Sequence, residues 1–140
     1  YAWRLCPAGE TLTEACFQRH HLEYAGETSV VHWVNGTEVT IPLVKTSIGT
    51  SPAGSQWARN PVPGWDGKPF PAPCQDCETC ADGNGCPRHA DHNFSIVDTL
   101  HVPNLPVGDY VLSWRWDCEV NPQVWNNCAD VSIVEDAVVV

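Results

Sequence analysis

The chain has 140 residues, of which 43% are hydrophobic and 17% charged, and its formal net charge is −10. This length predicts a single domain with a substantial core. Only 7 lysine and arginine residues accompany 17 acidic residues. Nucleic acid and anionic membrane surfaces are therefore not expected as partners, because both attract clustered positive charge. A neutral or a cationic partner remains open.

The cysteine content indicates the compartment in which the protein works. Eight cysteines, an even number, occur together with two N-glycosylation sequons that begin at Asn35 and Asn93. Both features are typical of proteins that mature in an oxidising, secretory environment. We therefore expect a secreted, extracellular protein with disulfide bonds and with a glycan on at least one of the two asparagines.

The first clear elements in chain order form a hairpin. Residues 1–17 hold Cys6 and Cys16 around a polar turn and predict an irregular, stapled start. Residues 30–34 (VVHWV) and 39–44 (VTIPLV) are rich in β-branched side chains and flank Asn35-Gly36. That dipeptide favours a type I′ turn between two antiparallel strands. Pro42 cannot donate to a ladder, so the second strand is expected at a sheet edge or at a bulge.

A long loop is predicted over residues 47–92, which are rich in proline and glycine. Loops of this length inside a domain are usually functional or cross-linked. Four cysteines could bind zinc by their number and spacing, but the oxidising context favours two disulfides within the loop. These cysteines are Cys74, Cys77, Cys80 and Cys86.

Strand character returns after the loop. Residues 94–102 alternate apolar side chains, interrupted by Asp98, and Val131 and Ile133 predict a last strand. Between them, a Gly-Asp-Tyr step enters a strand, which is typical of the tyrosine corner of immunoglobulin-like sandwiches. The pattern then places a row of large side chains on one strand face: Tyr110, Leu112, Trp114 and Trp116. No long helical period occurs, so the expected fold class is all-β, an immunoglobulin-like antiparallel β-sandwich with a disulfide-stapled loop region.

Two tryptophans are candidates for carbohydrate binding. Trp57 and Trp65 lie in the proline- and glycine-rich loop, where a core role is less expected than in a strand. Exposed indole rings can stack on sugars, because they cover apolar area at small entropic cost. The alternative is that both rings pack the loop against the sandwich. For Trp114 and Trp116 the pattern favours the core, because they continue the face of Leu112.

Histidines and nucleophiles give a weaker signal. His20-His21 and the pair His89 and His92 could each contribute to a metal site, although single histidines in polar loops are usually only exposed side chains. No nucleophile motif, phosphate-binding loop or carboxylate pair with a diagnostic spacing is present. No catalytic residue is predicted.

Three stretches resemble a known family. They are residues 6–18 (CPAGETLTEACFQ), residues 49–61 (GTSPAGSQWARNP) and residues 107–119 (VGDYVLSWRWDCE) with 127–130 (NCAD). They are similar to secreted lytic polysaccharide monooxygenase-like proteins of algae and other microbial eukaryotes. The resemblance implies an immunoglobulin-like sandwich with a flat polysaccharide-binding face. It also implies one copper ion, held by an N-terminal histidine and a second histidine.

The chain departs from that family at the copper site. Where better-known members have a Gln-x-Tyr step before a late cysteine, this chain has Gln123-Val124-Trp125. The resemblance therefore marks Gln123 and Trp125 as the vestigial floor of a copper site. The chain starts with Tyr1, and a terminal tyrosine cannot hold copper as the terminal histidine does. No cofactor is therefore expected for residues 1–140, and copper is expected only if a histidine lies upstream. The resemblance further suggests Cys118–Cys128 as a staple across the last turn. With Cys6–Cys16 as the other local staple and two bonds within the loop, all eight cysteines are expected to be paired.

These observations leave three functional hypotheses. The first is a secreted, carbohydrate-associated or structural extracellular domain, non-catalytic as given, that spans residues 1–140 as one domain of a possibly longer chain. The second is a copper-dependent polysaccharide monooxygenase whose terminal histidine lies upstream. The third is a glycoprotein module that assembles with copies of itself. The expected partner is a polysaccharide or another extracellular glycan.

Overall fold

The computed structural model describes residues 1–33, 35–61, 94–118 and 121–135. Within this part of the chain, the secondary structure consists of short and long strands in antiparallel ladders and one short helix, which confirms the all-β prediction. No described helix has the length and apolar character needed to cross a membrane. Several sequence predictions lie outside the described residues: Trp65, Cys74, Cys77, Cys80, Cys86, His89, His92 and Asn93.

The chain divides into two compact units that each combine segments distant in sequence. Unit 1 comprises Tyr1–Tyr24, Lys45–Ala58 and Leu100–Val140, and unit 2 comprises Ala25–Val44 and Arg59–Thr99. Each is described by itself. The prediction of one sandwich domain over residues 1–140 stays a prediction.

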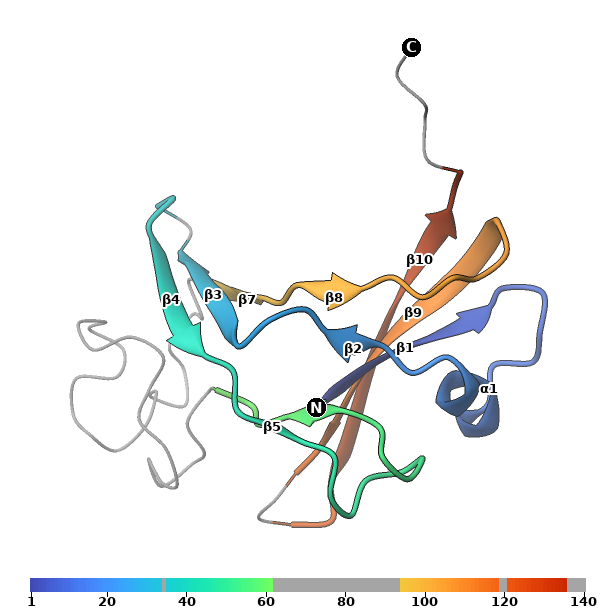
Figure 1. The fold of residues 1–140 in the computed structure, drawn as a ribbon, viewed down its shortest axis with the longest axis horizontal. Coiled ribbons are helices and arrows are strands. Elements are labelled where there is room, and N and C mark those ends of the chain that lie inside the picture. The colour runs from blue at the N-terminus through green and yellow to red at the C-terminus, as the bar shows by residue number, and fades with distance from the viewer. Residues whose placement is uncertain (34, 62–93, 119–120, 136–140) are drawn as a thin grey trace. The chain divides into compact units, whose positions relative to one another are not determined.

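Unit 1 is built on a three-stranded antiparallel sheet in the order β1-β9-β10 (Figure 1). Its strands are β1 (Ala2–Pro7), β9 (Gly108–Asp117) and β10 (Val124–Ile133). The β9–β10 hairpin keeps one register from Val124 opposite Asp117 to Ile133 opposite Gly108. β9 is therefore the central strand, which fits its alternation of large apolar and small or charged side chains.

Two short ladders complete the strands of unit 1. They are formed by β2 (Glu23–Tyr24) with β8 (Leu100–His101) and by β5 (Lys45–Thr46) with β6 (Trp57–Ala58). The core cluster of Leu5, Leu22 and Tyr110 packs against partly buried neighbours that include Leu100 and Leu112. The second ladder corrects the boundary of the predicted loop, because residues 57–58 form a strand instead of irregular structure.

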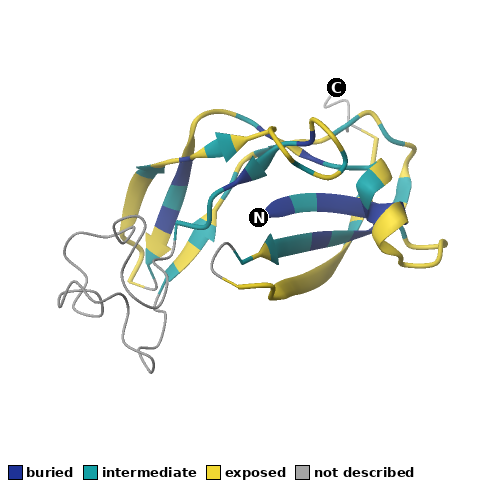
Figure 2. Ribbon diagram, turned by 90° about the horizontal axis from the view of Figure 1, so that it is seen from below, coloured by how far each residue is buried: buried dark blue, intermediate teal, exposed yellow. Residues whose placement is uncertain are grey.

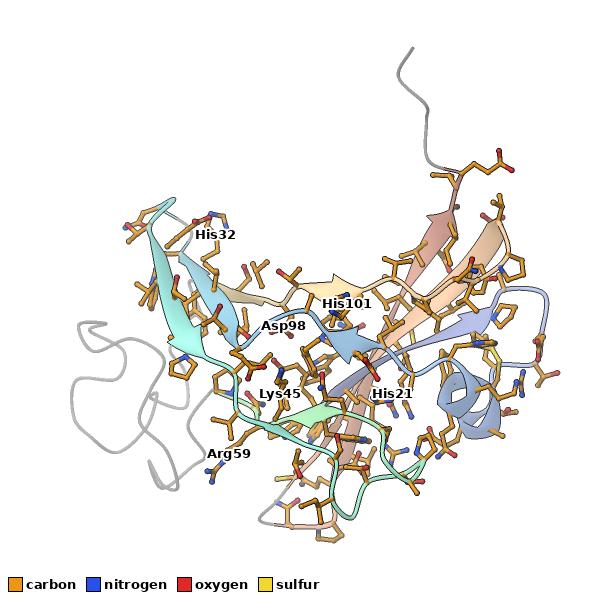
Figure 3. All side chains as sticks on the ribbon, in the orientation of Figure 1. His21, His32, Lys45, Arg59, Asp98 and His101 are labelled. Carbon is orange, nitrogen blue, oxygen red and sulfur yellow. A yellow bond between two sulfur atoms is a disulfide. The ribbon has the colours of Figure 1, made fainter. Side chains whose placement is uncertain are left out.

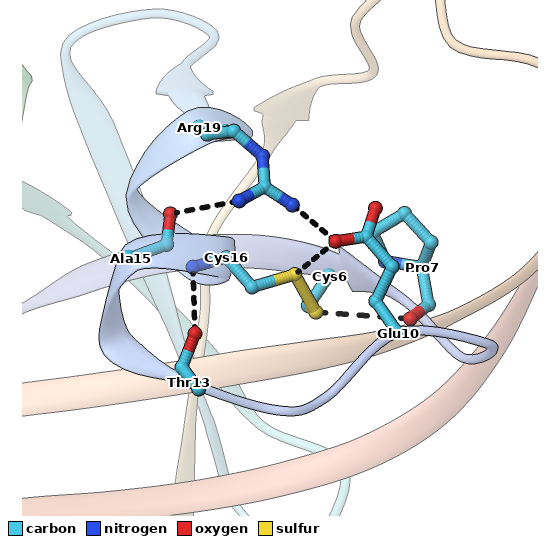
Figure 4. The surroundings of a disulfide bond; sticks show 7 residues. All are labelled: Cys6, Pro7, Glu10, Thr13, Ala15, Cys16 and Arg19. Atoms are coloured by element: carbon cyan, nitrogen blue, oxygen red, sulfur yellow. Dashed lines mark hydrogen bonds and ion pairs between the residues drawn. A yellow bond between two sulfur atoms is a disulfide. The ribbon is translucent and has the colours of Figure 1, made fainter.

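One short helix is not predicted by the sequence pattern. Helix α1 (Glu14–Arg19) has only six residues, too few for a recognisable helical period. Thr13 caps its N-terminus by accepting a hydrogen bond from the Cys16 N–H at 3.2 Å. The predicted Cys6–Cys16 disulfide is confirmed and joins α1 to β1, with a Cα–Cα distance of 5.5 Å (Figure 4). A helix this short is marginal alone, so the covalent link and its buried Phe17 hold it in place.

The predicted tyrosine corner is present. The Tyr110 hydroxyl donates to the carbonyl oxygen of Pro106 at 2.9 Å, and Tyr110 is buried. The bond spans four residues and fixes the approach of the chain to β9.

Unit 2 contains the predicted hairpin in a different turn. Its sheet has the order β4-β3-β7, formed by β3 (Thr28–Trp33), β4 (Glu38–Pro42) and β7 (Phe94–Val97). The type I′ prediction is wrong, because that turn needs two residues with positive φ and only Gly36, at φ 87°, has one. The chain instead reverses between Trp33 and Thr37, whose N–H and carbonyl bond at 2.8 Å. Pro42 lies on β4, an edge strand among those described, as its missing N–H requires.

Asp98 separates the predicted strand of residues 94–102 into β7 and β8. Its carboxylate accepts a hydrogen bond from the buried Ser29 hydroxyl at 2.6 Å. A charged side chain with this partner explains why the apolar alternation stops at Asp98.

The predicted Cys118–Cys128 disulfide is wrong in this structure. In the β9–β10 register Cys128 lies opposite Ser113, five residues before Cys118. With about 3.3 Å of rise per residue, the two Cα atoms lie well beyond the reach of a disulfide. Both cysteines are free thiols; Cys128 is exposed and Cys118 is partly buried.

Candidate functional site

An aromatic row runs along one face of the unit 1 sheet. It consists of Tyr24, Tyr1, Trp114, Trp116 and Trp125. The ring centroids of Tyr1 and Trp114 lie 5.9 Å apart, and those of Trp114 and Trp116 lie 6.3 Å apart. Trp125 lies directly opposite Trp116 in the ladder, so both side chains project from the same face.

Exposure increases along the aromatic row. Tyr24 and Tyr1 are 3% and 6% exposed, Trp114 and Trp116 are partly buried, and Trp125 is 54% exposed. The prediction that the two central tryptophans belong to the core is therefore right about the face and wrong about the depth. In Figure 2, which colours the ribbon by exposure, residues 124–130 of β10 are yellow because they are exposed. The row continues the core at one end and offers an indole ring to solvent at the other.

Two amides lie beside the exposed indole. Gln123 and Asn127 are exposed and, by the alternation of a strand, project from the same face as Trp125. The Gln123 carbonyl oxygen accepts from the Cys118 N–H at 2.9 Å, which fixes the backbone at the hairpin end. A flat aromatic ring flanked by amide donors and acceptors can stack on a sugar ring and bond to its hydroxyls. We call Trp116, Gln123, Trp125 and Asn127 the aromatic platform.

The opposite face of the sheet carries a charged cluster that the sequence analysis did not identify. Glu14 on α1 accepts from Arg4 at 2.5 Å and pairs with Arg115 at 2.7 Å. Arg115 also donates two hydrogen bonds to the Asp117 carboxylate, at 2.5 and 2.9 Å. Arg4 is 1% exposed and its guanidinium lies 5.6 Å from the Phe17 ring centre. Alternation along β9 put Arg115 and Asp117 on one face, but only the fold brings α1 to them.

The pKa shifts in this cluster follow from its charges. Burial raises the pKa of Glu14, but hydrogen bonds from Gln18 and Arg4 and the charges of Arg4 and Arg115 outweigh it, and the pKa lies below its ordinary value. The hydrogen bond to Asp117 raises the pKa of Arg115 further above neutrality. Both shifts favour the charged forms of Glu14 and Arg115, and the ion pairs of Glu14 with Arg4 and Arg115 anchor α1 on the sheet.

Trp57 belongs to this second face. It lies on β6, partly buried, with the Arg115 guanidinium carbon 6.0 Å from its ring centre. Its indole N–H donates to the Ser55 hydroxyl oxygen at 3.2 Å. These two contacts, the guanidinium over one face and the hydrogen bond from the indole N–H, hold the Trp57 ring in place and indicate a structural role. The geometry favours packing over sugar stacking for Trp57, which was one of the two predicted alternatives.

His21 is the most constrained of the described histidines (labelled in Figure 3). Its Nε2 bonds to the carbonyl oxygen of Gln56 at 2.6 Å, so Nε2 carries the proton, and its buried Nδ1 has no partner. Burial lowers the pKa of His21 below its ordinary value, despite the bond to Gln56. Its ring is held in the neutral form by the fold.

The described residues show no cluster of metal ligands of the usual kind. None of them form a cluster of three or more histidine, cysteine, aspartate or glutamate side chains that could hold a metal. His20 and His21 are adjacent in sequence, but His21 uses Nε2 for the Gln56 carbonyl. Gln123 and Trp125 are exposed side chains on the platform and have no group of ligands beside them.

No family model and no solved structure matches this chain. The resemblance to monooxygenase-like proteins therefore stays an expectation drawn from the three quoted stretches. The evidence for function is the arrangement of the side chains described above.

Proposed function

We propose that this protein is an extracellular, glycan-associated module that binds a neutral polysaccharide through the aromatic platform and is not itself catalytic. The observation that carries the proposal is the position of Trp125, which is 54% exposed at the end of an otherwise covered aromatic row. An indole ring that the fold leaves open beside two amides fits a flat, hydroxyl-rich ligand.

Charge and chemistry support this choice of ligand. No charged residue belongs to the platform, and the whole chain has a formal net charge of −10. A neutral chain such as cellulose or chitin therefore meets no repulsion, whereas anionic pectin does, most strongly at low salt. The cysteine content, the Cys6–Cys16 bond and the sequons support a secreted protein.

The proposed scaffold is an immunoglobulin-like sandwich related to the monooxygenase-like family. The tyrosine corner and the central position of β9 support it. Asn35 supports the glycoprotein part of the proposal, because it is exposed at the β3–β4 turn, where a glycan displaces no packed side chain. Its side-chain oxygen accepts from the Thr37 N–H at 2.9 Å, so the sequon is held in an Asx turn.

Depletion onto insoluble polysaccharide tests the proposal. The protein is mixed with cellulose, chitin or pectin, and the unbound fraction is measured with and without Trp125→Ala. We expect binding to a neutral polysaccharide that falls at least about tenfold in the variant, because a stacked aromatic ring contributes roughly 1–3 kcal/mol.

Leu12→Ala is the matched control. Leu12 is a large apolar side chain that is 52% exposed, like Trp125, but it lies outside the β1-β9-β10 sheet. Its replacement should leave binding unchanged. Equal binding by wild type and Trp125→Ala on every neutral polysaccharide would exclude the aromatic platform as the binding surface.

A further inference from the structure

We propose that β10 pairs with β10 of a second copy of this chain, antiparallel and around a two-fold axis at Cys128. β10 lies at an edge of the unit 1 sheet among the described strands. β10 is ten residues long, and among the described strands it pairs only with β9. Every residue in 124–130 is exposed.

The direction of the backbone groups identifies the residues that face outward. The Cys128 N–H donates to its neighbour Asn127 Oδ1 at 2.9 Å, not to β9. Gln123 is an odd-numbered position, and its carbonyl oxygen accepts a hydrogen bond from the Cys118 N–H on the β9 side of the hairpin. Because N–H and carbonyl groups alternate in direction along a strand, the even-numbered residues of β10 present theirs to the free edge.

Pairing would replace the local bond between the Cys128 N–H and Asn127 Oδ1, and otherwise this edge lacks the features by which proteins usually prevent pairing. Edge strands are commonly protected by lysine, proline, a bulge or short length. β10 has no proline and no lysine, its register with β9 has no bulge, and Asp130 is its one charged residue. It is also longer than the five or six residues of a typical strand.

A register centred on Cys128 fits the side chains to one another. It pairs Asn126 with Asp130 of the second copy, which are donor and acceptor, and Trp125 with Val131, an aromatic and a β-branched side chain. It brings all five outward-facing positions into the ladder: Val124, Asn126, Cys128, Asp130 and Ser132. A register shifted by one residue along each strand leaves at least one of these positions unpaired. Like charges do not meet at any position.

The chemical nature of the partner follows from this symmetry. In this register the side chains of β10 complement those of an identical strand that runs antiparallel to it. Such a two-fold, self-complementary contact is typical of homodimers. Backbone hydrogen bonds between the edges would supply the attraction, as in strand addition to open sheets.

Charge substitutions at Asn126 test the register without changing the backbone. Asn126→Asp places a carboxylate opposite Asp130 of the second copy, and Asn126→Lys places an ammonium there. Sedimentation velocity from micromolar to millimolar protein should show a reversible dimer in wild type. The dissociation constant should rise at least about tenfold in the aspartate variant and fall in the lysine variant. Thr11→Asp and Thr11→Lys change the net charge equally at an exposed site outside the edge and are the matched controls.

Cross-linking locates the axis. Diamide converts two thiols to one disulfide and is itself reduced to the hydrazine, so it joins only cysteines that meet. In this register the two Cys128 Cα atoms lie about 5.5 Å apart, within disulfide range. We expect a covalent dimer that Cys128→Ser abolishes and Cys118→Ser retains.

Three results would overturn the proposal. They are a monomer at all concentrations, equal dissociation constants for the two Asn126 variants after correction by the Thr11 controls, and a dimer that cross-links without Cys128. Circular dichroism confirms the fold of each variant before its association is compared.

Discussion

Glu14 is an exposed side chain that supplies the counter-charge of a buried arginine. It is 43% exposed, yet it bridges Arg115 and the almost fully buried Arg4. Removing the carboxylate would leave a buried guanidinium without its counter-charge, which costs more than a surface pair contributes.

We therefore expect Glu14→Gln to lower the free energy of unfolding by about 1–2 kcal/mol at pH 7. Glu10→Gln is the control, because it breaks a pair with Arg19 in which both side chains are about half exposed; its effect should stay within about 0.5 kcal/mol. Urea unfolding with the disulfide intact measures both. Since the pKa of Glu14 is lowered by folding, its contribution is present above the ordinary value of 4.5 and is lost as pH falls through the lowered pKa.

His21 predicts a second pH effect at the scale of one residue. Folding lowers its pKa, so below the ordinary value of 6.5 the unfolded chain binds a proton that the folded chain does not. The free energy of unfolding should therefore fall as pH decreases from 7.5 through 6.5. Below the lowered pKa, His21 should cause no further decrease. His21→Gln keeps a donor for the Gln56 carbonyl and removes the titration, so its unfolding free energy should vary less over this range. Identical pH profiles for the variant and wild type would contradict this account.

At the scale of elements, the β9–β10 hairpin determines the chemistry of two cysteines. Its register keeps Cys118 and Cys128 apart, whereas the contact of α1 with β1 brings Cys6 and Cys16 together. Sequence spacing is the same in both pairs, ten residues. The difference arises because a turn and a helix fold the first loop back on itself, whereas Cys128 lies on β10 opposite Ser113, five residues before Cys118.

Alkylation under denaturing, non-reducing conditions checks this register. We expect iodoacetamide to label Cys118 and Cys128 and to leave Cys6 and Cys16 unlabelled, as read by peptide mass spectrometry. Reduction before alkylation is the control and should label all four. A cross-linked peptide that contains both Cys118 and Cys128 would show that the hairpin has another register.

At the scale of the whole molecule, the two proposals combine into one expectation about avidity. A two-fold axis perpendicular to the sheet keeps the same face on the same side in both copies, so a dimer through β10 would present two aromatic platforms together. Linked sites bind a polymer more tightly than either site alone, by factors that reach 10²–10⁴ in favourable geometries.

Asn126→Asp should therefore weaken binding to insoluble polysaccharide at least about tenfold while leaving binding to a short soluble oligosaccharide unchanged. Depletion assays and calorimetry measure the two quantities on the same protein. Thr11→Asp again controls for charge. Loss of oligosaccharide binding in the Asn126 variant would show that the substitution acts on the platform and not on the dimer.

The sequence by itself determined the elements whose signal is local. The alternation from Tyr110 to Trp116 predicted the central strand and its two faces, because side chains in a strand must point in alternate directions. The Gly-Asp-Tyr step predicted the Tyr110 hydrogen bond, and the β-branched runs around Asn35-Gly36 predicted a hairpin. The six-residue helix α1 gave too short a pattern to detect.

Only the tertiary structure decided which distant groups meet. Pairing registers placed Trp125 opposite Trp116 and Cys128 opposite Ser113, and the docking of α1 brought Glu14 to two arginines. Local propensities leave these choices open, because register and docking depend on contacts between segments separated by many residues. The depth of burial is decided in the same way. The pattern gave Trp114, Trp116 and Leu112 one face, but the position of that face relative to the core cluster left the outer end of the aromatic row exposed.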